Sequence, residues 1–595
     1  MTKRGMVLLI SIFTLLFFTA CDNGTNDEDV VEVIDDNTDD TNSASGEYST
    51  ETIAEAMESN KTDHEEAEDA SWDAESATTI TLNGNSIEVS GSGAIADGSY
   101  VTISAAGTYL LQGVLNDGQI IVDTEDEETV KIVLNNVEAA NSTNAPFNVI
   151  SAEKVVVILP EGTENHFEDT ANYIFEDEEE DEPNATFFSK ADLSFYGTGT
   201  LSVDANYNDA ITSKDGLLID AGTFEISSAD DGIRGKDYLI IKGGNFTVHS
   251  EGDAFKSDED DDEDKGYILI EGGNFDITAA GDGFAAESDF LVAEGTFELV
   301  TGGGSDNYDE DISAKGMKSR VLTVIEKGDF VINSADDGVH SDGTIVIHDG
   351  TFTIATGDDG IHADVELAIH TGNINITESY EGLESDVIYI NDGEIHVTAS
   401  DDGINGAGDS EETGTGHGGF EASGNSYLYI NGGYIVVDAS GDGIDVNGSF
   451  EMSGGTVLVN GPTERMNGSL DYDRSFKLTG GVLVAAGSSG MVQTPGSTST
   501  QSSVLLNLQS QQSANTLFHI QKSDGTEVFT FAPAKRYQSV VFSSSLLEDG
   551  ESYDVYIGGS STGTVTDGVF EGGSYSAGTK VGTVTLSGSV TTVSQ

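Results

Sequence analysis

Aspartates recur along this chain in triplets of aspartate, glycine and an apolar residue, and their spacing could bring carboxylates together. The starting positions of successive triplets differ by 22, 29, 55, 22, 43 and 40, and weaker copies at Lys315 and Glu381 divide the gaps of 55 and 43. A fixed step of this kind indicates a repeat whose like positions lie above one another. The triplets begin at Asp231, Asp253, Asp282, Asp337, Asp359, Asp402 and Asp442.

Stacked carboxylates would be separated by about 4.8 Å, the spacing of hydrogen-bonded strands. At an effective dielectric constant of about 20, two bare charges at that distance repel by roughly 3.5 kcal/mol, so a cation is expected among them. Calcium takes oxygen ligands at about 2.3–2.6 Å and could contact two successive aspartates.

A second acidic column five positions further on would add ligands. The predicted calcium ligands are Asp231, Asp253, Asp258, Asp337, Asp342, Asp359, Asp364, Asp386, Asp402 and Asp442. The alternative is that each aspartate only makes a turn, with its carboxylate accepting a backbone N–H.

Cationic side chains follow many of these aspartates by three positions. They either neutralise the neighbouring aspartates or face an anionic sugar, and Lys256 or Lys318 beside calcium could act as the base of a lyase. Tyr238 and Tyr267 could stack on sugar rings, although packing within the fold is the alternative. The candidate carbohydrate-binding residues are therefore Arg234, Lys256, Lys318, His340, His362, Tyr238 and Tyr267.

Short strands must position these residues. A phenylalanine, later isoleucine or valine, follows a glycine by two positions with the same step, as at Phe224, Phe246 and Phe275. Segments such as 238–241 and 267–270 are typical of strands. A repeat unit of about 22 residues cannot bury its apolar side alone, which predicts an all-β, parallel β-helix over 77–496. A β-propeller is disfavoured because its blades need about 40–45 residues each.

The two ends of the chain differ from this repeat. Lys3 and Arg4 precede an apolar run and Cys21, which predicts a lipoprotein signal peptide at 1–20 and lipidation of Cys21. Residues 21–76 are acidic and lack an apolar period, which is typical of a disordered tether. Residues 497–595 lack the repeat and are expected to form an antiparallel β domain or cap.

The charge restricts the partners. The sequence has 107 acidic and 23 basic residues, a net charge of −84, which disfavours nucleic acid and anionic lipid surfaces. We expect an exported protein, exposed at the bacterial cell surface, that meets the membrane only through its lipid anchor and is a monomer. A single cysteine excludes a disulfide within one chain.

Several phrases resemble bacterial surface β-helix carbohydrate-binding proteins, which are similar in fold to pectate lyases. These are 117–126, 161–165, 358–364, 461–463, 470–473 and 529–533. The resemblance implies a right-handed β-helix that binds calcium through the repeated aspartates and binds plant-wall polysaccharides such as cellulose and polygalacturonate, without established catalysis. Ala254, Lys315 and Glu381 depart from the repeat.

Three functions follow from these observations. The leading hypothesis is a surface protein that binds polysaccharide, with no catalytic residues assigned. The alternatives are a calcium-dependent pectate or polysaccharide lyase and a structural adhesin.

Overall fold

The computed structural model describes residues 48–62, 65–175, 181–407 and 425–594. The predicted signal peptide, Cys21 and the tether up to residue 47 lie outside the described residues. Within the described ranges the chain is all-β apart from one turn of α-helix, α1 (Ile53–Ala56), and one 3-10 turn, η1 (Ser305–Asn307). No helix in these ranges is long and apolar enough to span a membrane.

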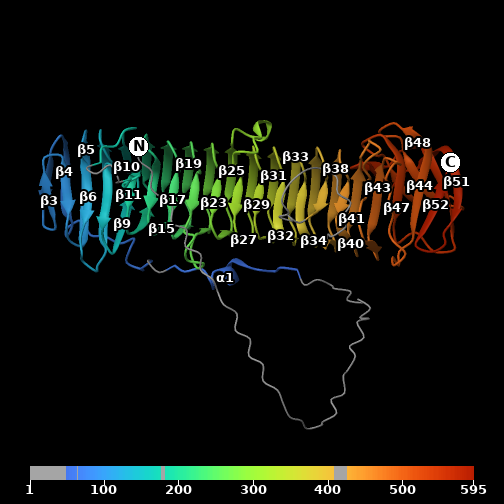
Figure 1. Ribbon diagram of the computed structural model, residues 1–595, viewed down its shortest axis with the longest axis horizontal. Helices are drawn as coiled ribbons and strands as arrows, with labels where there is room; N and C mark the ends of the chain where they lie inside the picture. Colours follow the sequence, from blue (N-terminus) through green and yellow to red (C-terminus); the bar gives the residue numbers. More distant parts are fainter. Residues whose placement is uncertain (1–47, 63–64, 176–180, 408–424, 595) are drawn as a thin grey trace, which may run out of the picture. The chain divides into compact units, whose positions relative to one another are not determined.

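Most strands belong to one 46-stranded sheet in which, away from its two ends, each strand pairs in parallel with a strand two or three further along the chain. The strands form three columns, named I, II and III, which the chain visits in turn (Figure 1). Column I contains β1 (Thr78–Gly84), β5 (Gly107–Leu115), β7 (Val130–Ala140), β10 (Glu164–Glu168), β13 (Thr200–Ala205), β16 (Thr223–Ser228), β19 (Asn245–Ser250), β22 (Asn274–Ala279), β25 (Thr296–Thr301), β28 (Asp329–Ser334), β31 (Thr351–Thr356), β33 (Asn373–Glu378), β35 (Glu394–Ala399), β38 (Tyr434–Ala439), β41 (Thr456–Asn460) and β43 (Val482–Gly487).

Column II follows the aspartate turns. It contains β4 (Tyr100–Ile103), β6 (Gln119–Asp123), β8 (Phe147–Ser151), β11 (Ala185–Ser189), β14 (Asp209–Ser213), β17 (Ile233–Gly235), β20 (Phe255–Ser257), β23 (Phe284–Ala286), β26 (Met317–Ser319), β29 (Val339–Ser341), β32 (Ile361–Ile369), β34 (Leu383–Ile390), β36 (Ile404–Gly406) and β39 (Ile444–Val446).

Column III completes each turn of the chain, and β32 and β34 run through columns II and III without a break. Its other strands are β9 (Lys154–Leu159), β12 (Asp192–Gly197), β15 (Gly216–Ile219), β18 (Tyr238–Ile241), β21 (Tyr267–Ile270), β24 (Asp289–Val292), β27 (Leu322–Ile325), β30 (Thr344–Ile347), β37 (Ser426–Ile430), β40 (Gly448–Met452) and β42 (Ser475–Leu478).

The register reproduces the spacing of the sequence repeat. Thr223 pairs with Asn245, Asn274 with Thr296 and Asp329 with Thr351, so the two members of each pair differ by 22 in sequence number. The step lengthens to 29 between Asn245 and Asn274, where the acidic loop after Ser257 is inserted. Lys315 and Glu381, the weaker copies, occupy the same turn as the aspartates.

The core lies inside the three columns and is organised by stacked phenylalanines. The ring centroids of Phe275 and Phe297 are 4.8 Å apart and those of Phe330 and Phe352 are 4.5 Å apart. The glycine two positions earlier makes room for the ring. At Gly350, φ is 143°, and a Cβ would lie 2.8 Å from the Phe352 ring. Only glycine fits this turn without strain.

The chain begins and ends with antiparallel strands. β1 pairs with β2 (Ile87–Ser90), and β3 (Ala94–Asp97) pairs with β4. At the other end, β44 (Ser503–Gln512), β47 (Tyr537–Ser543) and β52 (Val590–Ser594) extend the large sheet, with β47 antiparallel to β43. A second, six-stranded sheet contains β45 (Phe518–Lys522), β46 (Glu527–Phe531), β48 (Ser552–Ser561), β49 (Thr564–Thr566), β50 (Val569–Glu571) and β51 (Tyr575–Thr585). Residues 497–594 therefore cap the last turn of column I.

Residues 48–62 and 65–76, here called the strap, lie along the outer face of column III (Figure 1). Ile53, Ala56, Met57 and Trp72 pack on the apolar side chains of that face. The Lys154 ammonium forms an ion pair with Asp69 at 3.0 Å. The interpretation of 21–76 as a disordered tether is therefore wrong for this part, because the strap contacts the sheet through specific side chains.

Candidate functional site: the aspartate column

The repeated aspartates form one column at the turn before column II, as their spacing predicts. Oδ1 of Asp231 accepts the backbone N–H of Asp253 at 2.9 Å, and Oδ1 of Asp253 accepts that of Asp282 at 2.8 Å. Asp337 and Asp359 repeat this bond to the next turn. The turn-making role given as the alternative is thus present at these positions, and Oδ2 of each carboxylate is left for other partners.

Asp209 precedes Asp231 in the column, and the sequence analysis missed it. It is followed by Ala210 rather than glycine, so it lacks the triplet signature. Its carboxylate is buried and accepts the Thr212 hydroxyl at 2.8 Å. Its place one turn before Asp231, at the same sequence offset of 22, is the signal that could have identified it.

The cationic residues three positions after the aspartates are neutralising partners in the first part of the column. The Lys256 ammonium lies 3.2 Å from Asp231 and 2.8 Å from Asp253. Arg234 donates through Nε to Asp258 at 3.0 Å and lies 3.8 Å from Asp209. The Lys318 ammonium is 3.8 Å from Asp282.

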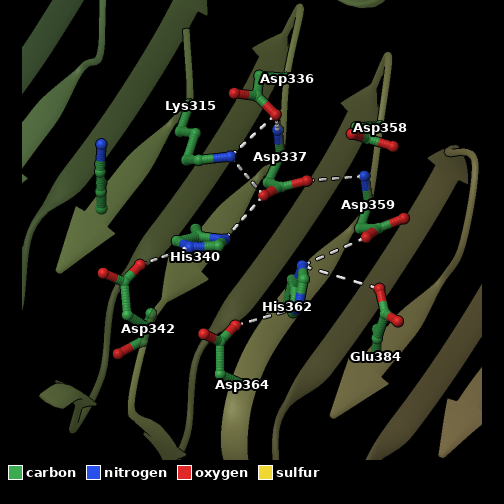
Figure 2. A network of polar contacts seen from close by, with 12 residues as sticks. Lys315, Asp336, Asp337, His340, Asp342, Asp358, Asp359, His362, Asp364 and Glu384 are labelled. Carbon is green, nitrogen blue, oxygen red and sulfur yellow. Dashed lines mark hydrogen bonds and ion pairs between the residues drawn. The ribbon is translucent and has the colours of Figure 1, made fainter. Parts of the chain in front are cut away.

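At some turns a cationic side chain lies between the two acidic columns. The His340 imidazole donates from Nδ1 to Asp337 at 2.8 Å and from Nε2 to Asp342 at 3.0 Å (Figure 2). Arg234 contacts Asp258 in the same way, and Asp386 accepts the Ser426 hydroxyl at 2.7 Å. A calcium ion shared between the two columns is therefore not supported at these turns, because a side chain already fills the space.

These contacts also set the protonation of the cations. Burial alone would lower the pKa of Lys256, but the charges of Asp231 and Asp253 outweigh it and raise the pKa. A lysine held as an ammonium is a poor proton acceptor. The geometry therefore argues against Lys256 as the base of a lyase.

Tyr238 and Tyr267 do not form an exposed sugar platform in this structure. They are 3% and 0% exposed, their rings stack on each other, and the Tyr267 hydroxyl donates to the Lys61 carbonyl of the strap at 2.9 Å. Their assignment as carbohydrate-binding residues is therefore wrong, because the strap covers both side chains. The sequence does not predict this cover, since the composition of the strap is typical of a disordered segment.

The last part of the column has no such cations. Carboxylate oxygens of Asp402, Asp442 and Asp445 all lie within 4.8 Å of one another, and the three side chains are half-buried. Burial and the neighbouring carboxylates raise the pKa of each to about 7. In the ranges that the structure describes, no lysine, arginine or histidine forms an ion pair with them. Asp445 occupies the position three residues after the column aspartate, where several earlier turns have a lysine, arginine or histidine.

A polar groove of about 610 Å³ crosses the turns between columns III and I. Glycines are among its lining residues, and polar side chains repeat along it from turn to turn. They include Asn245, Asn274, Thr296, Asp329 and Thr351. The amide of Asn274 donates to Asn245 at 3.0 Å, and the other side chains follow at the same register position of successive strands, which makes a ladder of polar groups.

Comparison with known proteins identifies the family of this chain. Residues 97–360 and 358–524 match the family model of carbohydrate-binding domain-containing proteins, so the chain belongs to that family. A carbohydrate-binding domain-containing protein of Acetivibrio thermocellus is 38% identical over 128 residues, which is 22% of this chain and 45% of the relative. The chain thus matches less than half of that relative's length.

Among solved structures, a polysaccharide lyase-like protein from C. thermocellum, determined as a gadolinium derivative, is similar to this chain. The sequence identity is 24% and the TM-score 0.35, over 50% of this chain and all of the other.

Proposed function

We propose that this protein is a cell-surface lipoprotein that binds polysaccharide through a calcium-stabilised, right-handed parallel β-helix of about 22 residues per coil. Cys21 would carry the lipid. The observation that carries the proposal is the cluster of Asp402, Asp442 and Asp445 in a chain that belongs to a carbohydrate-binding family. The mutual repulsion of three carboxylates this close favours a cation between them.

The donor set of this cluster fits calcium. Its ligand atoms are carboxylate oxygens, the type that calcium prefers, and half-burial leaves room for water ligands. Asp402, Asp442 and Asp445 would hold the ion, which would supply positive charge against the acidic surface. A polyuronate needs such a bridge, because the net charge of −84 otherwise repels it.

A neutral glucan has no charge penalty at this surface. The ladder of amide and hydroxyl groups in the groove offers hydrogen bonds to its hydroxyls, one set in each turn of the chain. Calcium removal should therefore abolish pectate binding and affect cellulose binding less.

A pull-down with insoluble cellulose and with calcium pectate gel tests the proposal. We expect the double variant D442N/D445N to lose pectate retention at least tenfold relative to the unchanged protein. The control D276N removes one exposed carboxylate from β22 and should behave as the unchanged protein. Failure of both polysaccharides to retain the protein when calcium is present would overturn the proposal.

A further inference from the structure

A second cluster in the aspartate column has a different composition. His340, His362 and Glu384 lie at the same position of three neighbouring strands, β29, β32 and β34. Each follows its column residue, Asp337, Asp359 or Glu381, by three positions. Figure 2 shows the carboxylates of Asp359 and Glu384 both directed at one nitrogen of His362.

The two histidines differ in how closely their partners approach. His340 Nδ1 is 2.8 Å from Asp337, within the usual range of a hydrogen bond. His362 Nδ1 is 3.4 Å from Asp359 and 3.7 Å from Glu384. Ligand atoms placed about 2.1 Å from a tetrahedral ion are about 3.4 Å apart, so the spacing around His362 matches that of a tetrahedral ion.

The surroundings of this cluster would hold the ligands in place. The other ring nitrogen of His362, Nε2, lies 3.4 Å from Asp364, so a carboxylate orients the imidazole from its far side. Oδ1 of Asp359 accepts the backbone N–H of Glu381 at 3.0 Å, which leaves Oδ2 directed at His362. Zinc-binding histidines commonly donate their other ring N–H to a carboxylate, which orients the imidazole.

The donor set also selects the ion. One imidazole nitrogen and two carboxylate oxygens suit a borderline ion such as Zn²⁺, whereas calcium takes oxygen ligands. The ligand side chains are 16%, 8% and 18% exposed for His362, Asp359 and Glu384, so a fourth position can be filled by water from solvent.

We propose that Asp359, His362 and Glu384 form a Zn²⁺ site with one open coordination position, oriented by Asp364. This site is separate from the oxygen-only cluster of Asp402, Asp442 and Asp445, which is proposed above to hold calcium. The proposal does not depend on polysaccharide binding.

Titration of the metal-free full chain with ZnCl₂, followed by calorimetry in millimolar CaCl₂, tests the site. We expect H362Q to weaken zinc binding at least tenfold and D364N to weaken it about 10–100-fold, the usual effect of losing a residue that orients a ligand. H340Q is the matched control, one turn earlier in the same position, and should change the dissociation constant less than threefold.

Cobalt(II) gives a second measurement. We expect the intense visible absorption of a tetrahedral site in the unchanged protein and in H340Q, and its loss in H362Q. Far-UV circular dichroism and the melting temperature show whether each variant is folded. Zinc binding that is equal in H362Q and the unchanged protein, or that calcium displaces, would overturn the proposal. Retention of H362Q on pectate and cellulose should stay unchanged.

Discussion

At the scale of single residues, the charge of each carboxylate in the column depends on the residue three positions later. Lys256 and His340 compensate the aspartates beside them, whereas Glu384 and Asp445 add further carboxyl groups. Glu384 shows the effect most strongly: burial and the Asp359 carboxylate raise its pKa to about 11. The same backbone turn thus produces a neutralised column at one end and a bare acidic one at the other.

His340 should make stability depend on pH. Burial alone would lower its pKa, but hydrogen bonds to Asp337 and Asp342 raise the pKa from 6.5 to about 9. The folded protein therefore binds this proton more tightly than the unfolded chain, and the stabilisation present below pH 6.5 is lost as the pH rises to about 9. We expect a loss on the order of 3 kcal/mol in the free energy of unfolding.

Urea unfolding across pH 6–10 measures this loss. H340Q should show a smaller decline than the unchanged protein over the same interval. If the two curves stay parallel, the histidine does not provide the stabilisation.

The sequence was sufficient for the column itself but not for its partners. The spacing of the triplets predicts that Asp231 and Asp253 are neighbours, and the hydrogen bond between them confirms it. It does not predict that His340 fills the space between Asp337 and Asp342. The same sequence spacing fits a metal ion bound by both aspartates and a histidine that forms an ion pair with each of them. Only the positions of the ring nitrogens distinguish them.

At the scale of elements, the glycine turn before column I is determined by the phenylalanine that follows it. G350A should destabilise the fold by about 2 kcal/mol, because the new Cβ would contact the Phe352 ring from a backbone conformation that disfavours side chains. The control is G243A, since a Cβ at Gly243 meets nothing closer than 3.6 Å. Equal melting temperatures for the two variants would contradict this explanation.

The strap is the element that sequence reasoning missed. Its acidic composition is typical of disorder, and its few apolar contacts, such as Ile53 and Met57, follow no period. Long-range polar contacts hold it instead: His348 and His370 hydrogen-bond to the carbonyls of Glu51 and Ser49. No local pattern encodes contacts between segments this far apart in the chain.

Removing one buried cation should release the strap. In K154M the Asp69 carboxylate, 1% exposed, loses its ion-pair partner, and breaking a buried pair costs about 3–5 kcal/mol. Trp72 is the only tryptophan in the chain and belongs to the strap, where it packs on the outer face of column III, so its emission should shift to the red at a lower temperature than global unfolding. K522M, which removes a more exposed pair with Glu548, is the control and should show a single transition. A single transition in K154M as well would show that the strap and the sheet unfold together.

At the scale of the whole molecule, the net charge of −84 opposes the folded state through self-repulsion. Raising NaCl from about 0.01 to about 0.5 M shortens the screening length several-fold, and the melting temperature should rise. Millimolar calcium should raise it further at equal ionic strength, and this extra increase should vanish in D442N/D445N. Equal effects of calcium and magnesium would contradict a specific calcium site.

The stacked phenylalanines keep their spacing even where a loop between two strands carries an insertion. Phe246 and Phe275 differ by 29 in sequence number and Phe297 and Phe330 by 33, yet their rings lie 5.0 and 4.8 Å apart, close to the 5.1 Å of Phe224 and Phe246. An added peptide leaves the interior unchanged. New surface segments can therefore be acquired, or grafted by design, at more than one turn of the scaffold, since one insertion lies between columns II and III and the other between columns I and II.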